Sequence, residues 1–383
     1  MPYSYQRQIL DRIKKMTFKG RALVIYGARR TGKTTLVKEY LKDFSREEST
    51  YLNCDEFDVR TALEDKTSTE LGAFIGKKKI IVLDEAQRVR NIGLAIKLLV
   101  DNFPGRQVIA TGSSSFELSN RIKESLTGRK FEFHLFPLSI GEIAARYSGI
   151  EIGRLTEKFL IYGMYPEVMD NGAEMAAILL KELASSYLYK DVLNYQNIRN
   201  PEILELLVKA LALQMGSEVS LNELASLLKI DKNTVASYIR ILEAAFVVFQ
   251  VGSFSRNLRN ELKKSRKIYF YDNGIRNALI NNLNPLSLRD DVGRLWDNFI
   301  VSERLKMQSN LGQSPSHYFW RTHQNQEIDL VEEENGQLSA FEIKWNPKRK
   351  FAIPSAFKQS YPDASFTLVN NQNYIDFLTT DGH

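Results

Sequence analysis

The chain has 383 residues, a length that favours two or three domains over a single core. Its 43% hydrophobic and 26% charged residues are typical of an ordinary globular protein, and the net charge of +6 is compatible with a nucleic-acid partner without requiring one. A single cysteine, Cys54, excludes a disulfide framework and a cysteine-based zinc site within the chain, and none of the four histidines pairs at metal-ligand spacing.

The first residues, MPYSYQRQILDRIKKM, are charged and amphipathic and lack the apolar core of a signal peptide. No apolar run approaches the roughly 20 residues that a membrane-spanning helix needs. We therefore expect a cytoplasmic protein without a membrane partner.

Short apolar runs alternate with helical stretches between residues 21 and 115, a pattern typical of a parallel sheet covered on both faces. Another strand, FEFHLF, follows, and Ser139-x-x-Glu142 is a capping box for a short helix. We assign residues 1–150 to one α/β domain.

The segment GARRTGKT, Gly27 to Thr34, matches G-x-x-x-x-G-K-[ST] between a predicted strand and a predicted helix. Such a loop wraps phosphate oxygens with backbone N–H groups, so it indicates a binding site for ATP with Mg²⁺. Lys33 is expected to reach the β- and γ-phosphates and Thr34 to ligate Mg²⁺. The alternative is a glycine-rich turn without a ligand. The predicted nucleotide-binding loop is Gly27, Ala28, Arg29, Arg30, Thr31, Gly32, Lys33, Thr34 and Thr35.

The strand KKIIVLDE delivers Asp84 and Glu85 to its carboxyl end, where parallel sheets bind ligands. We expect Asp84 to hold the Mg²⁺ water shell and Glu85 to act as the base that polarises the attacking water. In the next strand Ser113, or else Thr111, is placed to sense the γ-phosphate, although a serine here equally suits a helix cap. Arg129 could supply transition-state charge or be a solvated surface arginine.

The segments GARRTGKTT, IIVLDEAQR, IATGSSS, LTGRKFEFHLFPLS and YGMYPEV occur in this order, and the chain resembles the prokaryotic AAA-like ATPases related to the STAND class. The resemblance covers nearly the whole chain. It implies an α/β fold with a RecA-like P-loop core, a helical lid, a winged helix and a restriction-endonuclease-like C-terminal domain. It also implies that Pro166, in Gly163-Met164-Tyr165-Pro166, contacts the nucleotide from the lid.

Helical periodicity continues through residues 151–213, where Pro201 suits the first turn of a helix. Residues 214–275 then have the layout of a winged helix-turn-helix, with helices from Leu221 and from Thr234 to Glu243 and a following strand, FVVFQV. This element either binds DNA or packs internally. The candidate DNA contacts are Lys229, Lys232, Asn233, Arg240 and the basic run SRNLRNELKKSRK.

Residues 276–383 open with the helix GRLWDNFIVSERLKMQ and continue with the strand-like runs HYFW, EIDLVE and LSAFEIKW. The turn Asn335-Gly336 predicts a hairpin that sets Asp329 beside Glu342 and Lys344, so that the carboxylates could share a second Mg²⁺ or a Mn²⁺. The alternative is a half-buried strand whose polar side chains face solvent.

This D…E-x-K arrangement resembles the PD-(D/E)xK nucleases, which take a further acid from a preceding helix. Asp297 and Glu303 are the choices here, and Asp297 stands where related nucleases usually have glutamate. The sequence therefore predicts a Mg²⁺-dependent ATPase coupled to DNA, with metal-dependent nuclease activity as an added hypothesis. Alternatives are a nucleotide-controlled switch acting on a protein partner, with a non-catalytic C-terminal domain, or an inactive scaffold. The oligomeric state is left open.

Overall fold

A computed structural model describes residues 5–112, 126–186, 200–255 and 266–379, apart from positions 323, 325 and 350. The chain divides into two compact units. The first consists of Arg7–Pro137 and Ala244–Phe246, and the second of Met1–Gln6, Leu138–Glu243 and Val247–His383. Within the described part of the chain, no helix has both the length and the apolar character that crossing a membrane requires.

The first unit is built on a parallel sheet. Within the described residues its strands are β1 (Ala22–Tyr26), β2 (Ser49–Asn53), β3 (Ile80–Asp84), β4 (Gln107–Gly112) and β5 (Lys130–His134). They lie in the order β2-β3-β4-β1-β5, and all their pairings are parallel. Every residue of β1, β3 and β4 is buried, as the uninterrupted apolar runs of the sequence predict.

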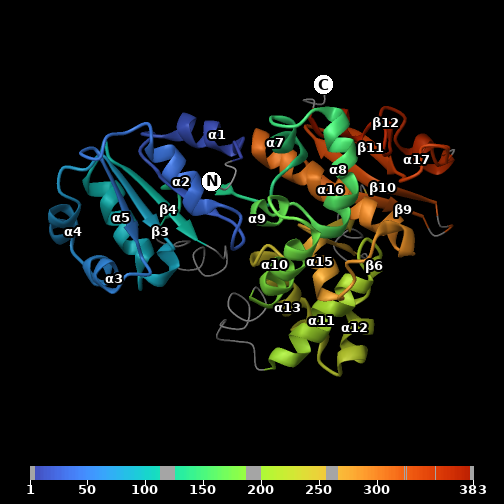
Figure 1. Cartoon of the computed structure of the whole chain (residues 1–383), viewed down its shortest axis with the longest axis horizontal. Helices are drawn as coiled ribbons and strands as arrows, with labels where there is room; N and C mark the ends of the chain where they lie inside the picture. Colours follow the sequence, from blue (N-terminus) through green and yellow to red (C-terminus); the bar gives the residue numbers. More distant parts are fainter. Residues whose placement is uncertain are drawn as a thin grey trace. The chain divides into compact units, whose positions relative to one another are not determined.

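Helices cover both faces of this sheet, and Figure 1 shows α2 on one side of the strands and α5 on the other. The core includes Leu23, Ile25, Val37 and Ile109. The helical elements of the unit are α1 (Ile9–Met16), α2 (Lys33–Leu41), α3 (Phe57–Leu63), α4 (Ser68–Ile75), the 3-10 turn η1 (Ala86–Arg88) and α5 (Ile92–Asn102). The segments that follow β1 and β3 leave the carboxyl edge of the sheet, the usual ligand edge of such folds.

The second unit begins with a helical region that leads into a helix-strand module. Its elements up to the last long helix are α7 (Ile140–Ala144), α8 (Gly149–Tyr162), α9 (Pro166–Met169), α10 (Ala173–Ser186), α11 (Pro201–Leu213), β6 (Glu218–Val219), α12 (Leu221–Leu228), α13 (Lys232–Ala244), β7 (Val248–Ser253), β8 (Arg266–Phe270), α15 (Asn273–Leu279), η3 (Leu286–Leu288) and α16 (Val292–Leu311). The Ser139–Glu142 capping box is present at α7, and Pro201 occupies the first turn of α11, both as predicted.

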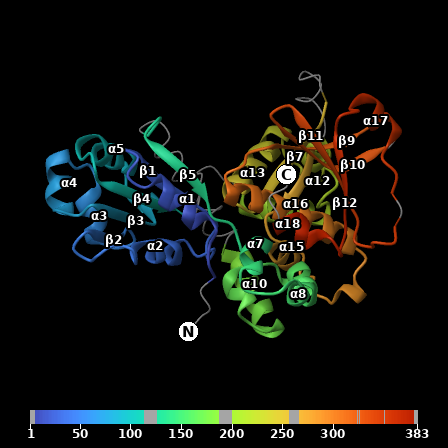
Figure 2. The same ribbon diagram turned by 90° about the horizontal axis from the view of Figure 1, so that it is seen from above.

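The remaining elements complete a mixed sheet. They are β9 (Ser316–Arg321), β10 (Glu327–Glu334), β11 (Gln337–Ile343), α17 (Ser355–Ser360), β12 (Ser365–Val369) and α18 (Tyr374–Thr379). Among the described residues the strand order is β12-β11-β10-β9-β7-β8-β6. Figure 2 shows β9 to β12 with α16 beside them. The predicted hairpin is confirmed: β10 and β11 are antiparallel, and Asn335 and Gly336 both have positive φ.

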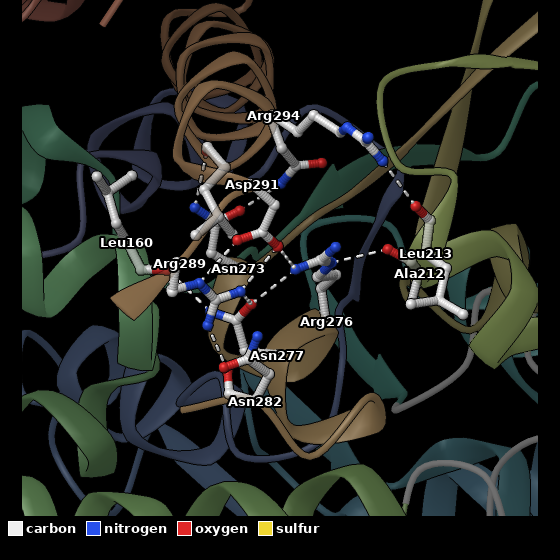
Figure 3. A network of polar contacts seen from close by, with 12 residues as sticks. Leu160, Ala212, Leu213, Asn273, Arg276, Asn277, Asn282, Arg289, Asp291 and Arg294 are labelled. Carbon is white, nitrogen blue, oxygen red and sulfur yellow. Dashed lines mark hydrogen bonds and ion pairs between the residues drawn. The ribbon is translucent and has the colours of Figure 1, made fainter. Parts of the chain in front are cut away.

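A buried polar network, drawn in Figure 3, joins the helical region to the start of α16. The Arg276 guanidinium donates to Asp291 at 2.5 Å, and Arg289 Nε donates to the same carboxylate at 2.8 Å. Asn277 Nδ2 donates to the carbonyl oxygens of Leu160 and Ile161 at the end of α8. These bonds fix α8, α15 and α16 relative to one another.

Three features of the structure differ from the predicted organisation. The first unit ends at Pro137 rather than at 150, and the regions predicted as 214–275 and 276–383 share one sheet, since β7 pairs with both β8 and β9. The second helix of the predicted helix-turn-helix begins at Lys232 instead of Thr234. Residues 187–199 and most of the basic run 255–267 lie outside the described residues.

Candidate functional site

The P-loop connects β1 to α2 in the predicted strand–loop–helix context. A Cβ added to Gly27 would stand 2.3 Å from the carbonyl oxygen of Leu135, so only glycine fits at this point. Gly32 precedes α2 with φ of +96°, a conformation that favours glycine. These two positions explain the two glycines of the motif, and the first turn of α2 directs its backbone N–H groups toward the loop.

Lys33 is buried, at 6% exposure, and its ammonium group is held over the loop. Lys33 Nζ donates to the carbonyl oxygens of Gly27 and Ala28, at 2.8 Å each. The positive charge therefore lies where the loop would receive an anion. A bound phosphate oxygen would replace these carbonyl oxygens as the acceptor of the Lys33 hydrogen bonds.

Asp84, at the end of β3, is the most densely bonded carboxylate of the site. Its Oδ2 accepts a hydrogen bond from Thr34 Oγ1 at 2.8 Å and another from the Tyr51 hydroxyl. Its Oδ1 accepts from Thr111 Oγ1. A hydroxyl group and a carboxylate side by side at the helix start are oxygen ligands of the kind that Mg²⁺ prefers, so the residues present fit a magnesium ion with a nucleotide phosphate.

Glu85 follows Asp84 with φ of +53°, an uncommon conformation for a glutamate. Its backbone N–H donates to Thr111 Oγ1 at 3.2 Å, and its Oε2 accepts from Gln87 Nε2 at 2.5 Å. Backbone and side chain are thus both fixed, and the carboxylate remains partly exposed.

Other predicted residues of this unit are distributed differently. Ser113 lies outside the described residues, whereas Thr111 contacts Asp84 directly. Arg129 precedes β5 and therefore lies at the amino end of the parallel strands, whereas the P-loop follows the carboxyl end of β1. It forms an ion pair with Asp101 at 2.7 Å. Arg129 is therefore not joined to the P-loop residues of this chain.

Sequence reasoning missed two residues that contact the loop or its carboxylate. Tyr51 binds Asp84, as described above. The buried guanidinium of Arg7 donates to the carbonyl oxygens of Thr31 and Phe136, at 2.6 Å each, and so ties the P-loop to the segment that follows β5. Arg7 lies in an irregular segment before α1, where no sequence pattern identifies it. It is recognised only in the structure, as a buried charged side chain.

Pro166 and the rest of Gly163-Met164-Tyr165-Pro166 belong to the second unit, where Pro166 opens α9. The Met164 N–H donates to Asp272 Oδ2 at 2.7 Å. Asp272 Oδ1 in turn accepts from the Ile275 N–H at 3.1 Å and caps α15. The contact of Pro166 with nucleotide stays a prediction.

The second unit brings together most of the predicted C-terminal residues. Lys344 Nζ lies 2.5 Å from Glu342 Oε1 and 3.2 Å from Asp329 Oδ2, and Asp329 Oδ2 also accepts from the Ile343 N–H at 2.9 Å. Glu342 is only 4% exposed, and its Oε2 has no hydrogen-bond partner within the described residues. Glu342 therefore does not face solvent.

Burial and neighbouring charges shift the pKa values of two carboxyl groups in this cluster. Burial, followed by the negative charge of Asp329, outweighs Lys344 and raises the pKa of Glu342 to about 7. Burial and Asp329 likewise raise the pKa of Asp297 well above its ordinary value. Asp297 and Lys344 line one cavity of about 480 Å³ together with Gly293, Ile343, Trp345, Asn346 and Arg349.

Glu303, the other acid predicted from α16, belongs to a different contact. Its Oε1 pairs with Lys306 at 2.7 Å, and its Oε2 accepts from the Ile140 N–H at 2.7 Å. Asp297 is thus the helix acid that shares the cavity with Lys344. Among the described residues, no three His, Cys, Asp or Glu side chains are grouped closely enough to hold a metal ion.

Family models match the chain in three parts. Residues 19–144 match an AAA domain, and residues 153–286 and 292–381 match two domains of unknown function, DUF8612 and DUF4143. The AAA match includes the P-loop, Asp84 and Glu85, so this part of the chain is similar to an AAA domain.

Relatives span most of the chain. "Uncharacterized protein MJ1544" of Methanocaldococcus jannaschii is 27% identical over 367 residues, which cover 91% of this chain and 80% of that protein. "Uncharacterized protein Rv2008c" of Mycobacterium tuberculosis is 28% identical over 345 residues, or 88% and 74% of the two chains.

Similar solved structures include a STAND protein with a tetratricopeptide repeat sensor from Pyrococcus horikoshii, with a TM-score of 0.31 and 12% identity over 80% of this chain and 47% of that one. Cdc6p from Pyrobaculum aerophilum has a TM-score of 0.29 and 12% identity over 72% and 92%. This chain thus spans less than half of the length of the Pyrococcus protein.

Proposed function

We propose that the protein is a Mg²⁺-dependent ATPase whose active site is the carboxyl edge of the first unit's sheet. The observation that carries the proposal is the direct bond between Thr34 of the P-loop and Asp84 of β3, which joins the two halves of a magnesium–nucleotide site. The AAA match over residues 19–144 supports the same function.

The contacts suggest a separate role for each residue of the site. The loop from Gly27 to Thr35 binds the phosphates, with Lys33 supplying positive charge, while Thr34 and Asp84 hold Mg²⁺, which would neutralise phosphate charge when bound. Glu85 accepts the proton of the water that attacks the γ-phosphorus, and its bond from Gln87 orients it. The chemistry is thus mainly positioning and charge stabilisation.

The test separates binding from turnover. In Glu85→Gln we expect ATP binding to persist while hydrolysis falls by about a hundredfold or more, because general base catalysis contributes roughly 10²–10⁴-fold. Lys33→Ala should weaken binding itself. The matched control is Glu56→Gln, an exposed acid of the same unit. Undiminished hydrolysis in Glu85→Gln would remove this residue as the base.

A second candidate function, metal-dependent phosphodiester cleavage, is favoured by the unpartnered, buried Oε2 of Glu342 beside Lys344 and Asp329. We expect Mg²⁺- or Mn²⁺-dependent cutting of DNA that Lys344→Ala abolishes while ATP hydrolysis continues. The control Lys348→Ala changes an exposed lysine nearby. Cutting that persists in Lys344→Ala would show that the cluster is not the cleavage site.

Coupling of the ATPase to DNA is supported by the exposure of Lys229, Lys232, Asn233 and Arg240 around α12 and α13. If DNA is the partner, it should accelerate hydrolysis, and its binding should weaken steeply with salt. An ATPase rate that no DNA or RNA changes would instead favour a switch that acts on a protein partner.

A further inference from the structure

We propose that Tyr51 is a positioning residue of the magnesium site, which holds the Asp84 carboxylate in the orientation that Mg²⁺ needs. The inference rests on the proposed function. It adds a residue that lies outside the P-loop and the acid pair and that no motif in the sequence identifies.

The geometry places the Tyr51 hydroxyl on the same oxygen that Thr34 uses. Both hydroxyl groups donate to Asp84 Oδ2, whereas Thr111 donates to Oδ1. The carboxylate is thereby bonded on both oxygens, and rotation about its Cβ–Cγ bond would break at least one of these contacts. Of these three hydroxyl donors, Tyr51 is the one that lies neither in the P-loop nor on a strand that carries a predicted site residue.

The strand register explains how Tyr51 reaches this position. β2 is parallel to β3, and Tyr51 pairs with Val82, two residues before Asp84. From there the long side chain extends toward the carboxyl edge. On its other side, Lys38 of α2 places its ammonium 5.2 Å from the centre of the Tyr51 ring. The ring is therefore fixed between the helix that follows the P-loop and the carboxylate at the end of β3.

In this bond the Tyr51 hydroxyl group is the donor, because an ionised carboxylate such as Asp84 can only accept. With Mg²⁺ bound, Thr34 and Asp84 would hold the ion, and Tyr51 would hold the Asp84 carboxylate from β2. Partners of this kind, which orient a group at a metal site, typically change metal affinity by about 10–100-fold.

The experiment is a Mg²⁺ titration of fluorescent N-methylanthraniloyl-ATP binding to the full chain. In Tyr51→Phe we expect the Mg²⁺ concentration for half-maximal binding to rise by about tenfold or more. Nucleotide affinity in EDTA should stay within about twofold of the wild type, because the P-loop is unchanged. A general loss of structure would lower both affinities and is thereby distinguished.

The matched control is Tyr40→Phe. Tyr40 is a buried tyrosine of the same unit, and its hydroxyl is hydrogen-bonded to Thr17 at 3.0 Å rather than to Asp84. An equal Mg²⁺ shift in both variants, no shift in Tyr51→Phe, or an equal loss with and without Mg²⁺ would overturn the inference. A wild-type chain that binds no nucleotide in the presence of Mg²⁺ would overturn the proposed function first, and the inference with it.

Discussion

Replacing Gly163 by alanine should destabilise the second unit strongly. Gly163 ends α8 with φ of +70° and ψ of −163°, a region that is almost exclusive to glycine and costs other residues about 1–3 kcal/mol. An added Cβ would stand 2.0 Å from Asp272 Oδ1. Displacing that buried carboxyl group would also break its bond from the Met164 N–H, a loss of about 1–3 kcal/mol. The free energy of unfolding should fall by roughly 2–6 kcal/mol.

The assay is denaturant unfolding followed by tryptophan fluorescence, which reports the second unit because all three tryptophans, Trp296, Trp320 and Trp345, lie in it. The control is Gly153→Ala in the same helix, where an added Cβ meets open space. It should stabilise the unit by about 0.5–1 kcal/mol, because alanine favours a helix interior. Equal unfolding free energies for the two variants would refute the reasoning from Gly163.

Acid should weaken the network of Figure 3. Burial raises the pKa of Asp291, but the hydrogen bonds from Arg289 and Arg276 outweigh burial and hold this pKa at about 2. Because its folded-state pKa is depressed, Asp291 contributes about 2 kcal/mol to the free energy of unfolding above pH 4, and this contribution is lost as the pH falls from about 4 to 2. Asp291→Asn should remove this pH dependence from the denaturant midpoints. Arg304→Ala leaves the buried Glu332 charge unpaired and should lower the unfolding free energy by about 3–5 kcal/mol, whereas Glu332→Gln in the same background should restore part of it. Arg7→Ala should raise the Kd for ATP severalfold while the exposed neighbour Gln6→Ala does not, as measured by nucleotide fluorescence.

The geometry of the candidate nucleotide site was largely predictable because the features that define it are local in sequence. Gly27 and Gly32 are required by backbone geometry inside one short loop, and Asp84 follows an apolar strand whose burial is evident from composition. Tyr51 and Arg7 were not predictable, since each acts through hydrogen bonds to groups more than twenty residues away in the sequence. A single tyrosine in a half-buried strand carries no periodic signal.

In the C-terminal cluster, the sequence pattern predicted which residues are neighbours but not whether they are buried. The NG hairpin correctly placed Asp329 beside Lys344, since strand pairing follows from a short turn. The same alternation of residues also allowed the alternative that Glu342 faces solvent, and the burial of Glu342 contradicts that alternative. β11 is paired on both edges, by β10 and β12, and the long helix α16 packs against it, so Glu342 is enclosed. Period-two patterns identify which residues share a face, but whether that face is covered depends on elements distant in sequence.

That burial sharpens the choice between a structural and a chemical role for Glu342. A buried carboxyl with one oxygen unpartnered is unfavourable by about 1–3 kcal/mol, and an apolar residue of similar size would avoid this loss. If the cluster were only structural, Glu342→Gln together with Lys344→Met should leave the unfolding free energy equal or higher, as for other buried ion pairs. A gain in stability combined with a loss of DNA cutting is the expected result for a site that sacrifices stability for function. A gain in stability with no change in any activity would instead leave the cluster without a chemical role.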